Sequence, residues 1–318
     1  MKKTVSILLL LLLTFAFASC SGPEDDRTVL TIDGYQVCYD EYRYFFMNNA
    51  AALAEDGITD FSVEENLELL RSETLEMLKK NCAIRNLSKK YKFTLDKNDK
   101  AEIAAQYDEI RAGFATKEEF LEGLKQSYLT DYEFRQVQEI NRQWQKLYDC
   151  MTNEANFIIQ ADNDTLLADI PENFYHGLQI LIVNDAGENK EENRKTANEV
   201  LSKLESGEDF YTLLGKYGED PGCANGIGYY FTSGELLRYF EDTVKSLKEG
   251  EHSGVVEGED GYAIVLREPI TDEYVTSHIE DFRVRYLARR FNEMLQEEMD
   301  SLTYKTTKLY FTLTPDAM

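Results

Sequence analysis

The chain of 318 residues carries few side chains in the patterns that mark nucleophilic or metal-dependent chemistry. Its five cysteines form no C-x-x-C pair, and His176, His252 and His278 show no metal-ligand spacing. A Gly-rich phosphate loop and a G-x-S-x-G motif are also missing from the sequence. The sequence therefore predicts a protein that works without a metal or cofactor.

Cys20 is the cysteine whose surroundings point to a modification. A basic start, Met1-Lys2-Lys3, precedes an apolar run over residues 5–18, which is shorter than the roughly 20 residues that a membrane-spanning helix needs. The run ends in Phe17-Ala18-Ser19-Cys20, which resembles the lipobox of bacterial lipoproteins except at Phe17. We expect residues 1–19 to be a signal peptide and residues 20–26 to be a lipid anchor on Cys20 followed by a tether. Ordinary cleavage without lipidation is the alternative.

The composition is strongly acidic, with a formal net charge of -25. Such a surface repels nucleic acid and anionic lipid, and it keeps a protein soluble outside the cytoplasm. Export also permits disulfides, so the sequence leaves open the redox state of Cys38, Cys82, Cys150 and Cys223.

The elements on either side of the middle of the chain are mainly helical. β-branched alternation around Asp33-Gly34 predicts a short hairpin, and Thr116 to Glu119 has the form of a capping box. Apolar residues at helical spacing predict helices over residues 39–53, 64–91, 99–112, 116 onward, 131–151 and 278–302. A β-like stretch over residues 306–313 follows the last helix.

The pattern changes to mixed strands and helices between Pro171 and residue 270. Strands are predicted over residues 179–183, 229–231, 255–256 and 262–266, and helices over 190–204, 208–217 and 233–247. This order predicts a small α+β domain over 171–270. Because helical segments flank it, we expect residues 27–170 and 271–318 to form one discontinuous domain into which it is inserted.

The middle segment resembles the parvulin family of peptidyl-prolyl cis-trans isomerases. The resemblance rests on seven short motifs in the family's order: Gln179-Ile-Leu-Ile-Val, Leu204-Glu-Ser-Gly-Glu-Asp-Phe, Tyr217-Gly-Glu-Asp-Pro-Gly, Phe231-Thr-Ser-Gly-Glu, Phe240-Glu-Asp, Leu247-Lys-Glu-Gly-Glu and Gly261-Tyr-Ala-Ile. The flanking helices resemble those of exported foldases of the PrsA and SurA type. The resemblance implies a SurA-N-like helical chaperone domain carrying an FKBP-like parvulin domain.

Isomerising an X-Pro bond requires the planar amide to lose its resonance, across a barrier of roughly 20 kcal/mol. A catalyst must favour the twisted amide, with an apolar pocket for the proline ring and polar groups near the carbonyl. The resemblance places the pocket at Leu236, Phe240 and Ala263, and the polar groups at Asp220 and Gln179. Gln179 and Ala263 stand where the family has histidines, so most of the family's polar network is replaced.

Two neighbours of these positions are poor substitutes for the missing groups. His176 lies an odd number of residues from Gln179, so on a strand it points to the opposite face, and we interpret it as a surface residue. Cys223 is interpreted as a loop residue rather than as the family's cysteine.

Three functions remain open at this point. The resemblance implies an exported, membrane-anchored foldase that acts on X-Pro segments of unfolded or newly secreted polypeptides, with weakened catalysis. A non-catalytic holdase chaperone is the second hypothesis, and a purely structural envelope lipoprotein is the third.

Overall fold

The computed structural model describes residues 22–184 and 189–318. The predicted signal peptide and the lipidation site Cys20 therefore lie outside the described residues. Within the ranges that are described, no helix has the length and apolar character needed to cross a membrane.

The chain divides into two compact units. The helical unit comprises Met1–Met151 with Asn292–Met318, and the inserted unit is Thr152–Phe291. The predicted α+β architecture, with a discontinuous helical domain that carries an insert, is thereby confirmed.

The inserted unit contains the predicted range 171–270 and extends past it on both sides. It also takes in α6 (Asn163–Asn173), α10 (Asp272–Ser277) and the first part of α11 (Ile279–Ser301). These flanking helices meet at the start of the sheet, where the rings of Phe174 and Phe282 lie 5.0 Å apart. An ion pair between Arg289 and Asp169, at 2.5 Å, joins α11 to α6.

The helical unit is built on long helices at the predicted places. Their bounds are Tyr39–Glu55 for α1, Glu64–Tyr91 for α2, Lys97–Ala112 for α3, Lys117–Gln126 for α4 and Asp131–Thr152 for α5. Thr116 caps α4 by accepting from the backbone N–H of Glu119 at 3.1 Å, while the Glu119 carboxylate accepts from Ala115 rather than from Thr116.

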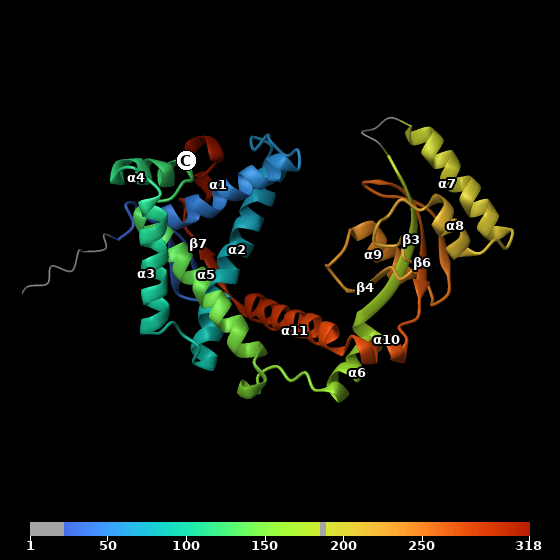
Figure 1. The fold of residues 1–318 in the computed structure, drawn as a ribbon. Coiled ribbons are helices and arrows are strands. Elements are labelled where there is room, and N and C mark those ends of the chain that lie inside the picture. Colours follow the sequence, from blue (N-terminus) through green and yellow to red (C-terminus); the bar gives the residue numbers. More distant parts are fainter. Residues whose placement is uncertain (1–21, 185–188) are drawn as a thin grey trace, which may run out of the picture. The chain divides into compact units, whose positions relative to one another are not determined.

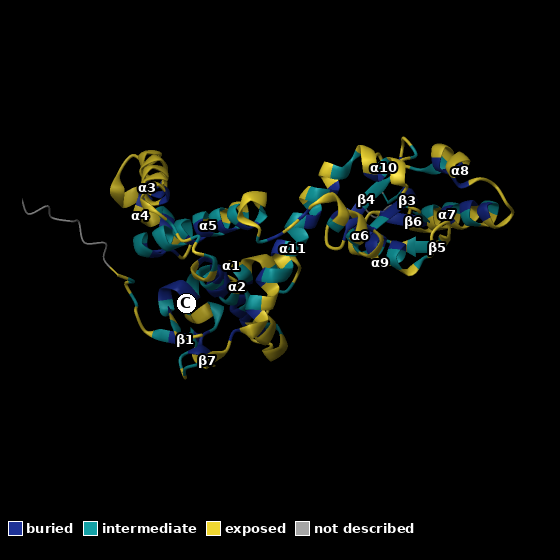
Figure 2. Ribbon diagram, turned by 90° about the horizontal axis from the view of Figure 1, so that it is seen from below, coloured by how far each residue is buried: buried dark blue, intermediate teal, exposed yellow. Residues whose placement is uncertain are grey.

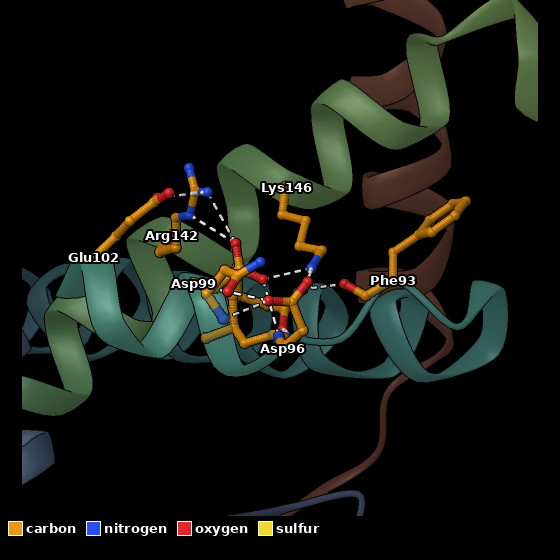
Figure 3. Close-up of polar contacts among 9 residues, drawn as sticks. Phe93, Asp96, Asp99, Glu102, Arg142 and Lys146 are labelled. Carbon is orange, nitrogen blue, oxygen red and sulfur yellow. Dashed lines mark hydrogen bonds and ion pairs between the residues drawn. The ribbon is translucent and has the colours of Figure 1, made fainter. Parts of the chain in front are cut away.

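A charge cluster fixes α3 against α5 (Figure 3). Asp96 caps α3, and Asp99 completes its capping box. Lys146 of α5 pairs with both carboxylates, and Arg142 bonds to Asp99 at 2.9 Å and to Glu102 at 2.8 Å. The hydrogen bond from Lys146 is the largest of the effects that lower the pKa of Asp96 to about 2. Most of α3 is exposed (Figure 2), so these contacts are important for holding the helix in place.

A three-stranded antiparallel sheet joins the two ends of the chain in the helical unit. Its order is β2-β1-β7, from Tyr35–Cys38, Thr28–Ile32 and Tyr304–Thr306. The hairpin turn falls at Asp33 and Gly34, which have φ of 49° and 84°. The predicted strand over 306–313 is wrong beyond residue 306. The chain turns there into short 3-10 helices at Tyr310–Thr312 and Pro315–Ala317, because the Tyr310 ring is buried edge-on against Tyr42, 5.7 Å away.

The inserted unit has a four-stranded antiparallel sheet in the order β4-β3-β6-β5. The strands are β3 (Phe174–Val183), β4 (Tyr229–Thr232), β5 (His252–Glu257) and β6 (Gly261–Glu268). Between them come α7 (Lys190–Glu205), α8 (Phe210–Tyr217) and α9 (Arg238–Ser246). The predicted order of strands and helices is confirmed.

The two faces of this sheet carry separate apolar cores. Leu178, Ile180 and Ile182 of β3 pack with residues of α7 and α8. Leu181 of β3 packs on the opposite face with Phe240 and Val244 of α9. Figure 1 shows α7 and α8 on one side of the β3–β6 pair and α9 on the other. The alternation of side chains along β3 therefore determines which residues can meet α9.

Candidate active site

Gln179 and Asp220 form the polar centre of the inserted unit. Gln179 lies in the middle of β3, and Asp220 lies near the start of the loop that follows α8. The Gln179 Nε2 donates to Asp220 Oδ2 at 2.7 Å, and both residues are buried. The structure thus brings together two predicted polar residues that lie 41 positions apart.

The orientation of the Gln179 amide follows from its partners. A carboxylate only accepts hydrogen bonds, so the amide nitrogen must face Asp220 and the amide oxygen must face the other way. On that other side the hydroxyl of Tyr239, on α9, donates to Gln179 Oε1 at 3.0 Å. Burial raises the pKa of Tyr239, which keeps this hydroxyl protonated.

The Asp220 carboxylate accepts further donors on both oxygens. Its Oδ1 accepts from the Tyr229 hydroxyl at 2.7 Å and from the backbone N–H of Gly222 at 2.9 Å. Its Oδ2 accepts from the Cys223 thiol at 3.5 Å besides Gln179. Four uncharged donors therefore satisfy the two buried carboxyl oxygens of Asp220.

Cys223 is a loop residue as predicted, yet it is fully buried and belongs to the polar network. Its thiol also accepts from the backbone N–H of Gln179 at 3.4 Å. Burial raises the pKa of Cys223 to about 12, so the residue is a neutral thiol and not a nucleophile.

The predicted pocket residues gather on the same face of the sheet. Phe240 and Ala263 belong to one apolar cluster, and Leu236 packs against it from the preceding loop. Phe240 is only 2% exposed and Ala263 is 0% exposed, whereas Leu236 is partly exposed. Leu236 is therefore the predicted pocket residue that a ligand can reach without a rearrangement.

The loop that carries Leu236 is held by one carboxylate. Helix α9 begins at Arg238 and not at residue 233 as predicted. The buried Glu241 side chain accepts from the backbone N–H groups of Gly234, Glu235 and Leu236, at 2.8 to 3.0 Å. It also pairs with Lys245 at 2.8 Å. These bonds satisfy the loop's N–H groups outside a helix, so the helix begins later than the sequence pattern predicts.

His176 takes no part in this network. Its ring nitrogens lie 3.1 Å from the Pro269 carbonyl oxygen and 2.7 Å from that of Ile227, and its ring stacks on Tyr230. The prediction of a surface residue is wrong, because His176 is 8% exposed.

Sequence reasoning missed Tyr229 and Tyr239. Both are close to predicted residues, since Tyr239 precedes Phe240 and Tyr229 begins β4, directly after the loop that carries Asp220. Their hydroxyls act on Asp220 and Gln179 only because the loop and α9 fold over the same face of β3. Neighbouring position alone gives no sign of that role.

Comparisons with known proteins identify the class of protein that the inserted unit resembles. Residues 180–268 match the family model "Rotamase: PPIC-type PPIASE domain". The predicted resemblance to the parvulin-type peptidyl-prolyl isomerases is therefore confirmed for the inserted unit.

The chain is also similar to PrsA foldases beyond this domain. It is 30% identical over 186 residues to the foldase protein PrsA of Geobacillus sp. (strain WCH70), which covers 56% of this chain and 57% of that protein. It is 24% identical over 326 residues to PrsA of Caldanaerobacter subterraneus, covering 97% of this chain and 95% of that protein. Against PrsA of Geobacillus kaustophilus it is 42% identical, but that match spans only 26% of the relative's length.

Solved structures give matches of the same kind. PrsA from Bacillus anthracis aligns with 70% of this chain and 96% of its own, at 20% identity and a TM-score of 0.36. NmPin, the parvulin of Nitrosopumilus maritimus, aligns with 31% of this chain and 99% of its own, at 32% identity and a TM-score of 0.25.

Proposed function

We propose that this chain is an exported foldase whose inserted unit is a peptidyl-prolyl cis-trans isomerase. The observation that carries the proposal is the buried Gln179–Asp220 hydrogen bond beside Phe240, within a parvulin-type domain. The substrates are X-Pro segments of unfolded or newly secreted polypeptides.

The site has the two parts that the reaction needs. Twisting the X-Pro bond makes its carbonyl more ketone-like and leaves a lone pair on the proline nitrogen, so a hydrogen-bond donor there favours the transition state. The Gln179 amide has two N–H hydrogens, of which one is directed at Asp220. Gln179 supplies the donor in place of a histidine, Asp220 orients it, and Leu236 with the edge of the Phe240 cluster receives the proline ring.

A holdase without turnover is the second candidate, because the site is tightly closed. Phe240 and Ala263 are almost completely buried, so a proline ring reaches them only after the loop or α9 moves. The helical unit offers a second place for apolar segments. A cavity of about 250 Å³ there is lined by side chains of α1, α2 and α5, among them Phe45, Met77 and Trp144.

The deciding experiment is a proline-limited refolding assay on the mature protein. Isomerase activity predicts acceleration above the uncatalysed rate, with loss of the acceleration in Gln179→Met, which keeps the volume but removes the amide. Phe240→Ala is a poor test, because emptying a fully buried aromatic site costs about 3–5 kcal/mol of stability. Wild type that suppresses client aggregation without accelerating refolding would establish the holdase instead.

We also propose that Cys20 is acylated and holds the protein on the outer face of a membrane. The lipobox-like sequence before Cys20 supports this. The Cys20→Ser variant, expressed from the full gene, should move from the membrane fraction to the soluble exported fraction. Recovery of wild type in the soluble fraction, cleaved but not acylated, contradicts the proposal.

A further inference from the structure

Tyr239 is attached to the polar centre from α9, the same helix that supplies Phe240. Its hydroxyl donates to Gln179 Oε1 at 3.0 Å, and its ring lies against the turn between β5 and β6. A Cβ on Gly258 in that turn would lie 2.6 Å from the Tyr239 ring, so the turn leaves room for this ring only as glycine. The ring position is therefore fixed from two sides.

The Gln179 amide is held at both ends by groups of opposite character. Asp220 accepts from Nε2 and Tyr239 donates to Oε1, so rotating the amide by half a turn would set a donor against a donor and an acceptor against an acceptor. With the Tyr239 hydroxyl removed, Oε1 loses its partner in a buried site, where an unsatisfied polar group is unfavourable. The amide would then turn toward other donors, and its free N–H would no longer point in one direction.

We infer that Tyr239 is a positioning residue of the isomerase reaction, which acts by holding the Gln179 amide in the orientation that presents its second N–H to the substrate. This inference rests on the proposed isomerase function. Asp220 holds the amide at its nitrogen, and the Tyr229 hydroxyl donates a hydrogen bond to Asp220 in turn. The two tyrosine hydroxyls and Gln179 together make up a polar network without histidine.

The test is a double-mutant cycle with Tyr239→Phe and Gln179→Met in the mature protein. Tyr239→Phe keeps the ring and loses only the hydroxyl, so we expect kcat to fall about tenfold, the value of one hydrogen bond, while KM changes less than twofold. Because Tyr239 acts through Gln179, the double variant should be no slower than Gln179→Met alone. The matched control is Tyr211→Phe, whose hydroxyl bonds to Glu268 at 2.8 Å on exposed surface, and which should keep wild-type kcat.

A second readout follows the amide directly. The side-chain ¹⁵N–¹H signals of Gln179 should shift in Tyr239→Phe and stay unchanged in Tyr211→Phe. Losses in kcat that add in the double variant, or unchanged amide signals in Tyr239→Phe, overturn the positioning role while leaving the isomerase function intact. A wild-type protein that does not accelerate refolding at all overturns both.

Discussion

The amide nitrogen of Gln179 lies 2.7 Å from a carboxylate oxygen of Asp220. Both groups are buried, and each supplies the other with a hydrogen-bond partner. Gln179 is one of four donors to Asp220, and Asp220 fixes which way the amide faces. The pair joins the centre of β3 to the loop after α8, so the chemistry and the stability of the inserted unit are linked.

Asp220→Asn should therefore cost both stability and activity. The substitution keeps the shape but turns one acceptor oxygen into a donor, which then opposes either Gln179 and Cys223 or Tyr229 and Gly222. We expect a loss of about 1–3 kcal/mol in the free energy of unfolding, measured by urea denaturation. The matched Asp242→Asn, at an exposed pair with Arg238, should change it by less than about 0.5 kcal/mol. Equal values for the two variants would contradict the buried network.

Gly222→Ala should separate Tyr229 from Asp220. A Cβ at Gly222 would lie 1.9 Å from the Tyr229 hydroxyl oxygen, so the phenol must move. We expect lower isomerase activity and an altered near-ultraviolet circular dichroism signal from the tyrosine. Gly254→Ala, where nothing lies within 4 Å of the added Cβ, serves as the control and should resemble wild type. A Gly222→Ala protein with wild-type activity would show that Tyr229 is dispensable.

Glu241→Gln should loosen the loop that carries Leu236. Burial opposes ionisation of Glu241, but the backbone N–H groups of the loop and the Lys245 ammonium outweigh it and lower the pKa of Glu241. A carboxyl whose pKa is depressed on folding contributes stability above its unfolded pKa, and that contribution is lost as the pH falls through the folded pKa. We expect the difference in unfolding free energy between wild type and Glu241→Gln to be full at pH 7 and to shrink below about pH 4.5, the ordinary value of the group. A difference independent of pH would refute this role.

Glu133 in the helical unit should make stability fall as the pH rises from acidic to neutral. Burial, with the nearby Glu41 carboxylate, raises the pKa of Glu133 to about 7. The folded chain then binds this proton more tightly than the unfolded chain, so ionisation destabilises the fold as the pH rises from about 4.5 to 7. Glu133→Gln should remove that decline and be more stable than wild type at pH 8. Glu122→Gln on the exposed face of α4 is the control, and it should follow the wild-type curve.

The sequence by itself determined most of the helices and the order of the strands. Helix α2 has the predicted bounds because its apolar spacing is a local property, and the Asp33-Gly34 turn forms because both residues take positive φ there. The period-2 pattern likewise placed Gln179 and His176 on opposite faces of β3. These features depend on residues that are close together in the chain.

Tertiary structure alone decided where the polar groups meet and where some elements stop. Glu241 delays the start of α9 by binding the loop before it, and Tyr310 ends the strand pairing after β7 by entering the helical core. Tyr229 and Tyr239 reach Asp220 and Gln179 only once the loop after α8 and helix α9 are packed on β3. A buried polar group must find its partner wherever the packed chain brings one within about 3 Å, and sequence spacing does not encode that distance.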